Sequence, residues 1–178
     1  MNRYVALLRG VNVGGINLKM ADVAAAFSDL DVQNVKTVLA SGNVLFDSVD
    51  TAEKTKPRIE AALRAAFGYE AWVHILDLPS LGQIVADFPF NAEREGWHPY
   101  VIFVAGDENA TELAQNLVAL QPELDPALES VAGGDGVVYW TVERGHTLDS
   151  VIGKATSRAR YKSMTTTRNL RTLQKLLR

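Results

Sequence analysis

The chain has 178 residues, 47% of them hydrophobic, and a formal net charge of −3. This length suits one domain or two small ones with a sizeable core. The absence of cysteine excludes disulfides, thiolate metal sites and cysteine nucleophiles, and fits a reducing compartment. No apolar run approaches the roughly 20 residues of a membrane span, and the first one ends at Arg9 without a cleavage site. We therefore expect a cytoplasmic protein without a membrane partner.

Apolar periodicity in the first half of the chain predicts the order strand, helix, strand, strand, helix, strand. The predicted strands span residues 4–8, 34–39, 44–46 and 71–76, and the two predicted helices of this order span 20–30 and 57–67. A further short helix is predicted after them, at 79–86. This is the order of a split β-α-β unit, or ferredoxin-like module.

The second half of the chain partly repeats this order. Two prolines and many charges predict a linker at residues 88–99. Beyond it the pattern predicts a strand at 100–105, a helix at 110–120, a hairpin around 133–136, and helices from 148 and at 170–177 separated by Thr165–Thr167. We expect an α+β fold with two ferredoxin-like subdomains, residues 1–87 and 100–178, the second followed by a basic C-terminal helical segment.

Charge is divided unevenly along the chain. Residues 151–178 hold eight Lys or Arg and no Asp or Glu, so this tail sums to +8, whereas the other 150 residues sum to −11. A cationic segment rich in hydroxyls and amides is suited to holding an anion or to docking on an acidic surface. The acidic overall balance argues against a dedicated nucleic-acid binder.

The segment Arg9-Gly-Val-Asn-Val-Gly-Gly15 lies between a predicted strand and a predicted helix. Backbone N–H groups at such a position can converge on an anion, and glycines let the ligand approach. The candidate binding residues here are Arg9, Asn12, Gly14, Gly15 and Lys19. The spacing matches neither a P-loop nor a dinucleotide fingerprint. The alternative is a tight loop in which Asn12 bonds its own backbone.

The sequence Ser41-Gly42-Asn43 joins two predicted strands and presents a hydroxyl and an amide at a hairpin tip. Ser41 and Asn43 are therefore candidate ligand contacts. The tip falls either at the sheet edge that carries the Arg9 segment or at the opposite edge. The alternative is a plain turn, because Gly and Asn accept positive φ cheaply.

The basic tail contains a further candidate group at Thr166, Thr167, Arg168 and Asn169. The guanidinium of Arg168 offers a bidentate fork for phosphate or carboxylate, and threonine hydroxyls can cap the helix that follows. The alternative is a capped helix with Arg168 bound to an acidic residue of the remaining chain.

No metal or other cofactor is expected. His74, His98 and His146 are scattered, with no i, i+4 pair among them. Tryptophans fall mostly in predicted strands, where sheet packing is the expected role. Trp97, in the predicted linker, is the exception and a candidate stacking surface.

Three motifs together resemble a known family. Residues 4–15 (YVALLRGVNVGG), 41–46 (SGNVLF) and 166–169 (TTRN) are similar to the bacterial domain-of-unknown-function family numbered 1697. That family usually has Trp after Arg-Asn, whereas Leu170 stands here. The resemblance implies an α+β protein of two small sheet-containing subdomains, and it implies no established activity, cofactor or catalytic residue.

Three functional hypotheses follow. The first is binding of an anionic ligand, which is a phosphorylated small molecule, a nucleotide or RNA. The second is a metal-independent enzyme acting on a phosphorylated or carboxylated substrate, with Arg9 and Arg168 stabilising negative charge; the sequence contains no evident general base. The third is a structural role in which the tail docks on the acidic body or on a partner subunit. Catalytic residues and oligomeric state are left open.

Overall fold

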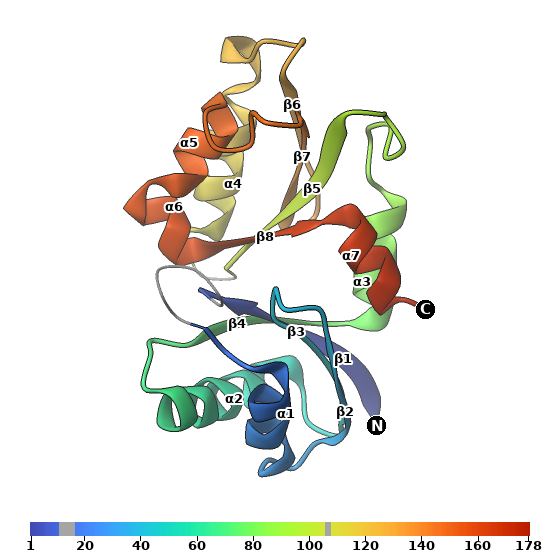
Figure 1. The fold of residues 1–178 in the computed structure, drawn as a ribbon, viewed down its shortest axis with the longest axis vertical. Helices are drawn as coiled ribbons and strands as arrows, with labels where there is room; N and C mark the ends of the chain where they lie inside the picture. Colours follow the sequence, from blue (N-terminus) through green and yellow to red (C-terminus); the bar gives the residue numbers. More distant parts are fainter. Residues whose placement is uncertain (11–16, 106–107) are drawn as a thin grey trace. The chain divides into compact units, whose positions relative to one another are not determined.

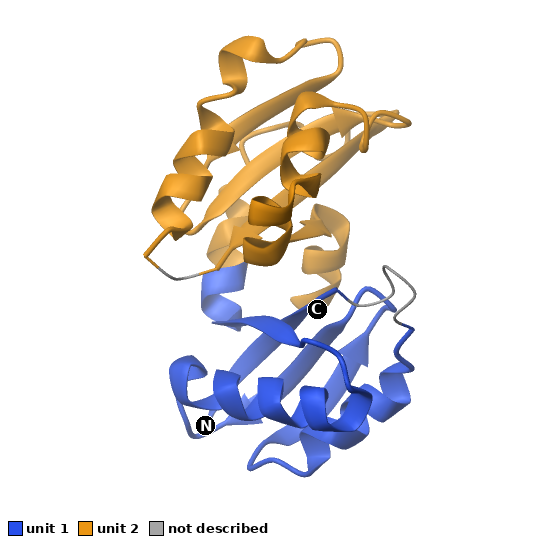
Figure 2. Ribbon diagram, turned by 90° about the vertical axis from the view of Figure 1, so that its left-hand side faces the viewer, with its two compact units in different colours: residues 1–81 blue, residues 82–178 orange. Residues whose placement is uncertain are grey.

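A computed structural model describes residues 1–10, 17–105 and 108–178. Over these residues the chain forms seven α-helices and eight strands, and the strands make two four-stranded antiparallel sheets (Figure 1). The expected α+β class is therefore confirmed. Two compact units contain the sheets, Met1–Leu81 and Gly82–Arg178 (Figure 2). None of the described helices has the length and apolar character needed to cross a membrane.

The first unit holds the first sheet, in the order β2-β3-β1-β4. Its elements in chain order are β1 (Asn2–Arg9), α1 (Met20–Ser28), β2 (Gln33–Val38), β3 (Asn43–Ser48), α2 (Ala52–Phe67) and β4 (Trp72–Asp77). A further helix, α3 (Leu78–Ala86), spans the division between the units.

Both long helices of the first unit cover the same face of its sheet (Figure 1). Phe27 of α1 and Leu63 of α2 pack with Phe46 and Leu8 of the sheet, and all four side chains are buried. Helix α2 begins five residues before Pro57, where we had predicted its start. The proline lacks an N–H, so one i→i−4 hydrogen bond is missing in the second turn.

The second unit holds the second sheet, in the order β6-β7-β5-β8. Its elements are β5 (Trp97–Val104), α4 (Ala110–Val118), a 3-10 turn η1 (Gln121–Glu123), β6 (Glu129–Gly133), β7 (Val137–Glu143), α5 (Val151–Ser157), α6 (Ala159–Met164), β8 (Thr165–Asn169) and α7 (Leu170–Leu176).

The two faces of the second sheet pack differently. Leu117 of α4 and Ile152 of α5 meet Ile102 on one face. On the other face the Tyr139 hydroxyl donates to the Ile84 carbonyl at 2.7 Å, and the Phe88 ring meets the Tyr139 ring edge-on. The segment predicted as a linker, 88–99, thus lies within the second unit, and its last three residues begin β5.

The basic tail differs from the predicted helical segment. Residues Thr165–Asn169 form the edge strand β8, which pairs antiparallel with β5. Three consecutive threonines favour a strand because a β-branched side chain fits a pleated surface better than a helix. The sequence pattern alone predicts only a break between two helices at these threonines. Their pairing with β5 completes the second sheet.

Candidate functional site

Arg9 and the turn at residues 41–43 lie at the same end of the first sheet. Arg9 is the last residue of β1, and the N–H of its neighbour Leu8 donates to the Gly42 carbonyl at 2.8 Å. Asn43 pairs with Leu7 of β1. Trp72, the first residue of β4, pairs with Arg9 from the other side. We call this end, with Arg9, residues 41–43 and Trp72, the Arg9 edge.

The Arg9 guanidinium is half-buried beside an exposed indole ring. Its Cζ lies 5.8 Å from the centroid of Trp72, and the Cζ of Arg64 lies 4.7 Å from the same ring. Burial lowers the pKa of Arg9, and the charges of Glu60 and Glu70 act in the opposite direction. The buried Nε of Arg9 has no hydrogen-bond partner within the part of the chain that the structure describes.

Glu60 is already matched by other cations. Arg64 Nη2 donates to its Oε2 at 3.3 Å, and Lys56 Nζ lies 3.6 Å from its Oε1. The Nε of Arg64 also donates to the Ala71 carbonyl at 3.2 Å, which fixes that side chain at the end of α2. Arg9 therefore makes no ion pair with the described carboxylates, although the charges of Glu60 and Glu70 act on it electrostatically.

Asn43 builds the turn at the Arg9 edge. Its side chain is fully buried, and its Nδ2 donates to the Val38 carbonyl at 2.8 Å and to the Ser41 Oγ at 2.9 Å. Ser41 itself is exposed. Of the two predicted contacts, Ser41 presents a hydroxyl to solvent, whereas the described contacts of Asn43 hold the turn together.

Lys19 is exposed and directly precedes α1, where its carbonyl accepts from the N–H groups of Asp22 and Val23. The predicted contacts Asn12, Gly14 and Gly15 lie outside the described residues. The anion site formed by their backbone N–H groups stays a prediction.

The predicted group in the tail is divided between the two faces of β8. Alternation along the strand places Thr166 and Arg168 on one face and Thr167 and Asn169 on the other. Arg168 is 6% exposed, and its Nη1 donates to the Thr166 Oγ1 at 2.7 Å and to the Thr167 carbonyl at 3.0 Å. Burial lowers the pKa of Arg168 to about 10, so the group stays charged at neutral pH. Asn169 caps α7, since its Oδ1 accepts from the Arg171 N–H at 2.9 Å.

Most tail cations are exposed, unlike Arg168. Arg160 pairs with Glu112 at 3.1 Å, and both side chains are more than half exposed. An exposed pair of this kind contributes little to stability, about 0–1 kcal/mol. Lys154, Arg158 and Lys162 make no ion pair with any described residue. The described ion pairs therefore give little support to docking of the tail on acidic groups.

Two tryptophans lie in surroundings that the sequence did not indicate. Trp72, interpreted as a packing residue, is 37% exposed at the Arg9 edge. Trp97, interpreted as a stacking surface, is 6% exposed, and the Cζ of Arg94 covers its ring at 3.6 Å. The position of Trp72 beside Arg9 depends on the register of two strands that are distant in sequence, which no local pattern reveals.

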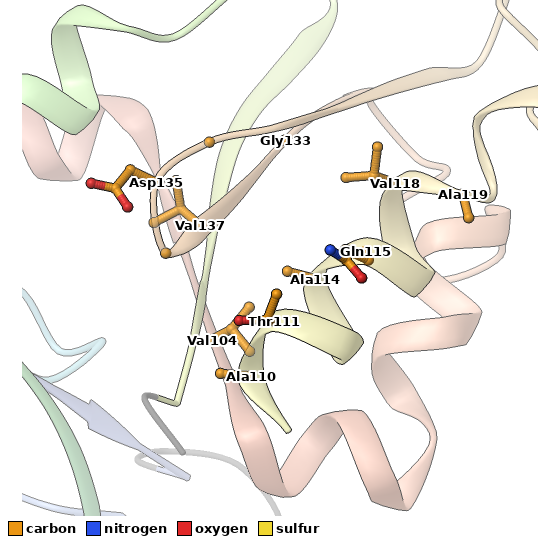
Figure 3. Close-up of a pocket in the computed structure, with 12 residues that line it drawn as sticks. Val104, Ala110, Thr111, Ala114, Gln115, Val118, Ala119, Gly133, Asp135 and Val137 are labelled. Atoms are coloured by element: carbon orange, nitrogen blue, oxygen red, sulfur yellow. The ribbon is translucent and has the colours of Figure 1, made fainter. Parts of the chain in front are cut away.

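A pocket of about 900 Å³ opens in the second unit between α4 and the β6–β7 turn (Figure 3). Its lining is mostly small or apolar, and its polar side chains are Thr111, Gln115 and Asp135. None of the predicted binding residues lines it, and no cation is among its described lining residues. An anion site is therefore better sought at the Arg9 edge.

Across the described ranges, no three His, Cys, Asp or Glu side chains gather as a metal site requires.

Residues 1–139 match the family described as protein of unknown function, DUF1697. The chain belongs to the DUF1697 family. The matched residues include the Arg9 edge and exclude β8, so the Thr-Thr-Arg-Asn motif of this DUF1697 chain lies beyond them.

One solved structure supports the fold of this DUF1697 chain. The chain is similar to the conserved bacterial protein SP0830 from Streptococcus pneumoniae, with a TM-score of 0.78, 21% identity, and coverage of 98% of this chain and 96% of that one. An unknown protein from Galdieria sulphuraria is aligned over 94% and 96% of the two chains at 12% identity, but its TM-score of 0.27 is too low to inform the fold. No curated protein matches the sequence.

Proposed function

We propose that the Arg9 edge binds an anionic ligand, which is a phosphorylated small molecule, a nucleotide or RNA. One observation carries the proposal. Arg9 is a half-buried cation without an ion pair among the described residues, and its buried Nε has no partner there. A buried donor left unsatisfied costs about 1–3 kcal/mol. An oxyanion bound to this guanidinium would supply a negative charge that compensates the guanidinium and a strong hydrogen-bond acceptor for its Nε.

The neighbours of Arg9 support binding at this edge. The ring of Trp72 holds the guanidinium through a cation–π contact, which contributes about 0.5–1 kcal/mol at an exposed site. The exposed hydroxyl of Ser41 lies at the same end of the sheet and adds a donor for a second ligand oxygen. Together they offer a fixed cation and a rotatable hydroxyl, which suits a phosphate or carboxylate group.

Binding is favoured here over catalysis. Of the two carboxylates that act on Arg9, Glu60 is buried and engaged by Lys56 and Arg64. A general base must reach the proton that it removes, and this carboxylate is held by other groups. The described candidate base near Arg9 is therefore the exposed Glu70, and none of the described hydrogen bonds or ion pairs orients its side chain.

Further parts of the proposal concern the ligand contacts in the tail, the fold of each unit and the cellular location. Thr166, Thr167, Arg168 and Asn169 remain predicted ligand contacts, and their described hydrogen bonds give them a role in β8 and α7 as well. Each unit is proposed to be ferredoxin-like, which the order of elements and of strands supports. The absence of cysteine supports a cytoplasmic setting.

A thermal-stability screen tests the proposal. Inorganic phosphate, AMP and a short RNA are added to the wild-type protein, to Arg9→Gln and to the control Arg58→Gln. Arg58 is a surface arginine of the same unit that pairs with Asp50. A ligand that binds the native state raises the melting temperature. We expect a rise in the wild type and in Arg58→Gln that disappears in Arg9→Gln. A rise that survives in Arg9→Gln, or no rise with any probe, rejects the site.

A further inference from the structure

A row of three aromatic rings leads from the core of the second unit to its surface. Tyr100 of β5 stacks on the buried Trp140 of β7, with ring centroids 5.2 Å apart and an interplanar angle of 28°. On the same strand, the ring of His98 lies 5.5 Å from that of Tyr100. His98 and Tyr100 are both only partly buried. The row therefore presents aromatic surface at the beginning of β5.

Two arginines belong to the segments that follow the neighbours of β5: Arg144 follows β7, and Arg171 lies in α7, which follows β8. Arg144 directly follows β7, and its backbone N–H donates to the Gly96 carbonyl at 2.8 Å, two residues before His98. On the other side, the backbone N–H of Arg171 donates to the side chain of Asn169, which pairs with Tyr100. Three segments distant in sequence thus meet around the His98 ring.

Both guanidinium groups act on the imidazole. Burial lowers the pKa of His98, and the charges of Arg144 and Arg171 lower it further. Among the described residues no carboxylate contributes to this shift. The shift favours the neutral imidazole, and the ring lies within the influence of two arginines that make no ion pair among the described residues.

These two arginines differ from several other surface arginines of the chain. Arg3, Arg58 and Arg160 each pair with a carboxylate. Arg144 and Arg171 are exposed and make no ion pair within the described ranges. Two guanidinium groups without an ion pair, both acting on one ring, favour a polyvalent oxyanion, because a phosphate can accept hydrogen bonds from both. The adjacent rings favour a planar group attached to that phosphate.

We propose that His98, Tyr100, Arg144 and Arg171 form a nucleotide-binding site on the second unit. The two guanidinium groups hold the phosphate, and the base lies against the aromatic surface at His98. The nucleotide is either free in solution or one residue of a single-stranded RNA, since both present the same chemistry. This site shares no residue with the Arg9 edge and does not depend on it.

A pH dependence of binding follows from this arrangement. A bound phosphate places negative charge beside His98 and raises the pKa of its imidazole. A group whose pKa rises on binding takes up a proton, so protonation of His98 favours binding as pH falls below neutrality. The phosphate, whose second pKa is about 6, loses part of its negative charge over the same range, so binding through the arginines alone would weaken as pH falls.

The imidazole signals in a ¹H–¹³C NMR spectrum test the site directly, because the chain has three histidines. The probes are AMP, adenosine, inorganic phosphate and an oligoadenylate of about eight nucleotides, a length within the usual range of single-strand sites. We expect AMP to shift the His98 signal and to leave His74 and His146 unchanged. Adenosine and phosphate should each bind at least roughly tenfold more weakly than AMP, because each lacks one half of the contacts. Tighter binding of the oligonucleotide than of AMP would identify RNA as the source, and equal binding a free nucleotide.

Matched arginine variants complete the experiment. Arg144→Gln and Arg171→Gln should each weaken AMP binding by roughly tenfold and raise the pKa of His98 in the free protein. The control Arg158→Gln removes another exposed, unpaired tail charge and should change neither quantity. An equal loss in Arg158→Gln, or a His98 signal unmoved by millimolar AMP, overturns the proposal. Arg9→Gln should retain the His98 shift, so failure at one site is distinguishable from failure at the other.

Discussion

The indole N–H of Trp140 donates to the buried carboxylate of Glu129 at 3.0 Å. The same carboxylate accepts from the backbone N–H groups of Val151 at 2.7 Å and Ile152 at 3.2 Å. Glu129 lies in β6, Trp140 in β7, and the two amides begin α5. One side chain therefore joins two strands to the start of a helix, and it binds the edge of the ring on which Tyr100 stacks.

Replacing Glu129 by Gln should destabilise the second unit. All three groups around the carboxylate are hydrogen-bond donors. In glutamine an NH₂ group replaces one carboxylate oxygen, so one of these donors would face another donor and lose its acceptor. A buried donor left unsatisfied costs about 1–3 kcal/mol. Urea unfolding measures the change in the free energy of unfolding. The exposed Glu123→Gln should leave it within about 0.5 kcal/mol, as for most surface substitutions. Equal stability of the two variants would contradict the structural role of Glu129.

Gly153 should tolerate no side chain. A Cβ added there would lie 1.9 Å from the Thr147 carbonyl oxygen and 2.8 Å from the Ser150 Oγ, which caps α5 by accepting from the Gly153 N–H. The contact with a backbone oxygen forces the chain to move. We therefore expect Gly153→Ala to lower the free energy of unfolding by about 1–3 kcal/mol or more.

A second glycine in a helix provides the control for Gly153. A Cβ at Gly82 of α3 would meet only the Leu177 side chain, at 4.0 Å. Alanine in a helix interior is favoured over glycine by roughly 0.5–1 kcal/mol, so Gly82→Ala should be neutral or stabilising. Thermal melting of both variants measures this difference. A Gly153→Ala protein as stable as the wild type would show that the helix start is looser than described.

The turn at the Arg9 edge should separate stability from binding. Asn43→Ala removes a buried amide that donates to Val38 and Ser41, and it should cost about 1–3 kcal/mol. Ser41→Ala removes one acceptor of that amide but leaves the Val38 carbonyl in place, so it should cost less, about 0.5–1.5 kcal/mol. If the hydroxyl contacts the ligand, Ser41→Ala should nevertheless reduce the thermal shift produced by phosphate or AMP. Denaturant unfolding and the ligand screen, run on both variants, give the two readouts. A phosphate or AMP shift unchanged in Ser41→Ala would remove Ser41 from the site.

Local patterns in the sequence predicted much of the element order. Continuous apolar runs predicted β1 and β5, and glycine-containing turns, predicted at 40–43 and 133–136, indicated both hairpins. These signals are short-range, because the hydrophobic periodicity of an element and the residue types of a turn depend on neighbouring residues. The strand β8 was missed for a related reason. Its threonines have strand propensity, but only the open edge of β5 makes that propensity effective.

The composition of the candidate sites was harder to predict. Arg9 meets Trp72 only because β1 and β4 pair in one register, and Arg144 and Arg171 approach His98 from two separate segments. No spacing rule in a single sequence connects residues 98, 144 and 171. In the Thr166–Asn169 motif, residues that are adjacent in the sequence are separated in the structure, because they lie on opposite faces of a strand. The pairing of the strands, which is non-local, therefore determined which charges lie together.

The buried charge of Arg168 should make stability depend on pH in the alkaline range. Burial lowers the pKa of the folded protein's Arg168 to about 10, below the value of the unfolded chain. Between these two values the unfolded state binds more protons, so the free energy of unfolding rises with pH by up to an amount on the order of 3 kcal/mol. Below pH 10 this group's contribution is constant. Tyrosines that ionise in the same pH range require a reference variant. Arg168→Met serves as this reference, because it keeps an unbranched though shorter side chain and removes the charge. The difference in unfolding free energy between the wild type and Arg168→Met, measured from pH 8 to 11, should move in favour of the wild type as pH passes about 10. A difference that stays flat across this range would mean that Arg168 is stabilised as a cation by its surroundings.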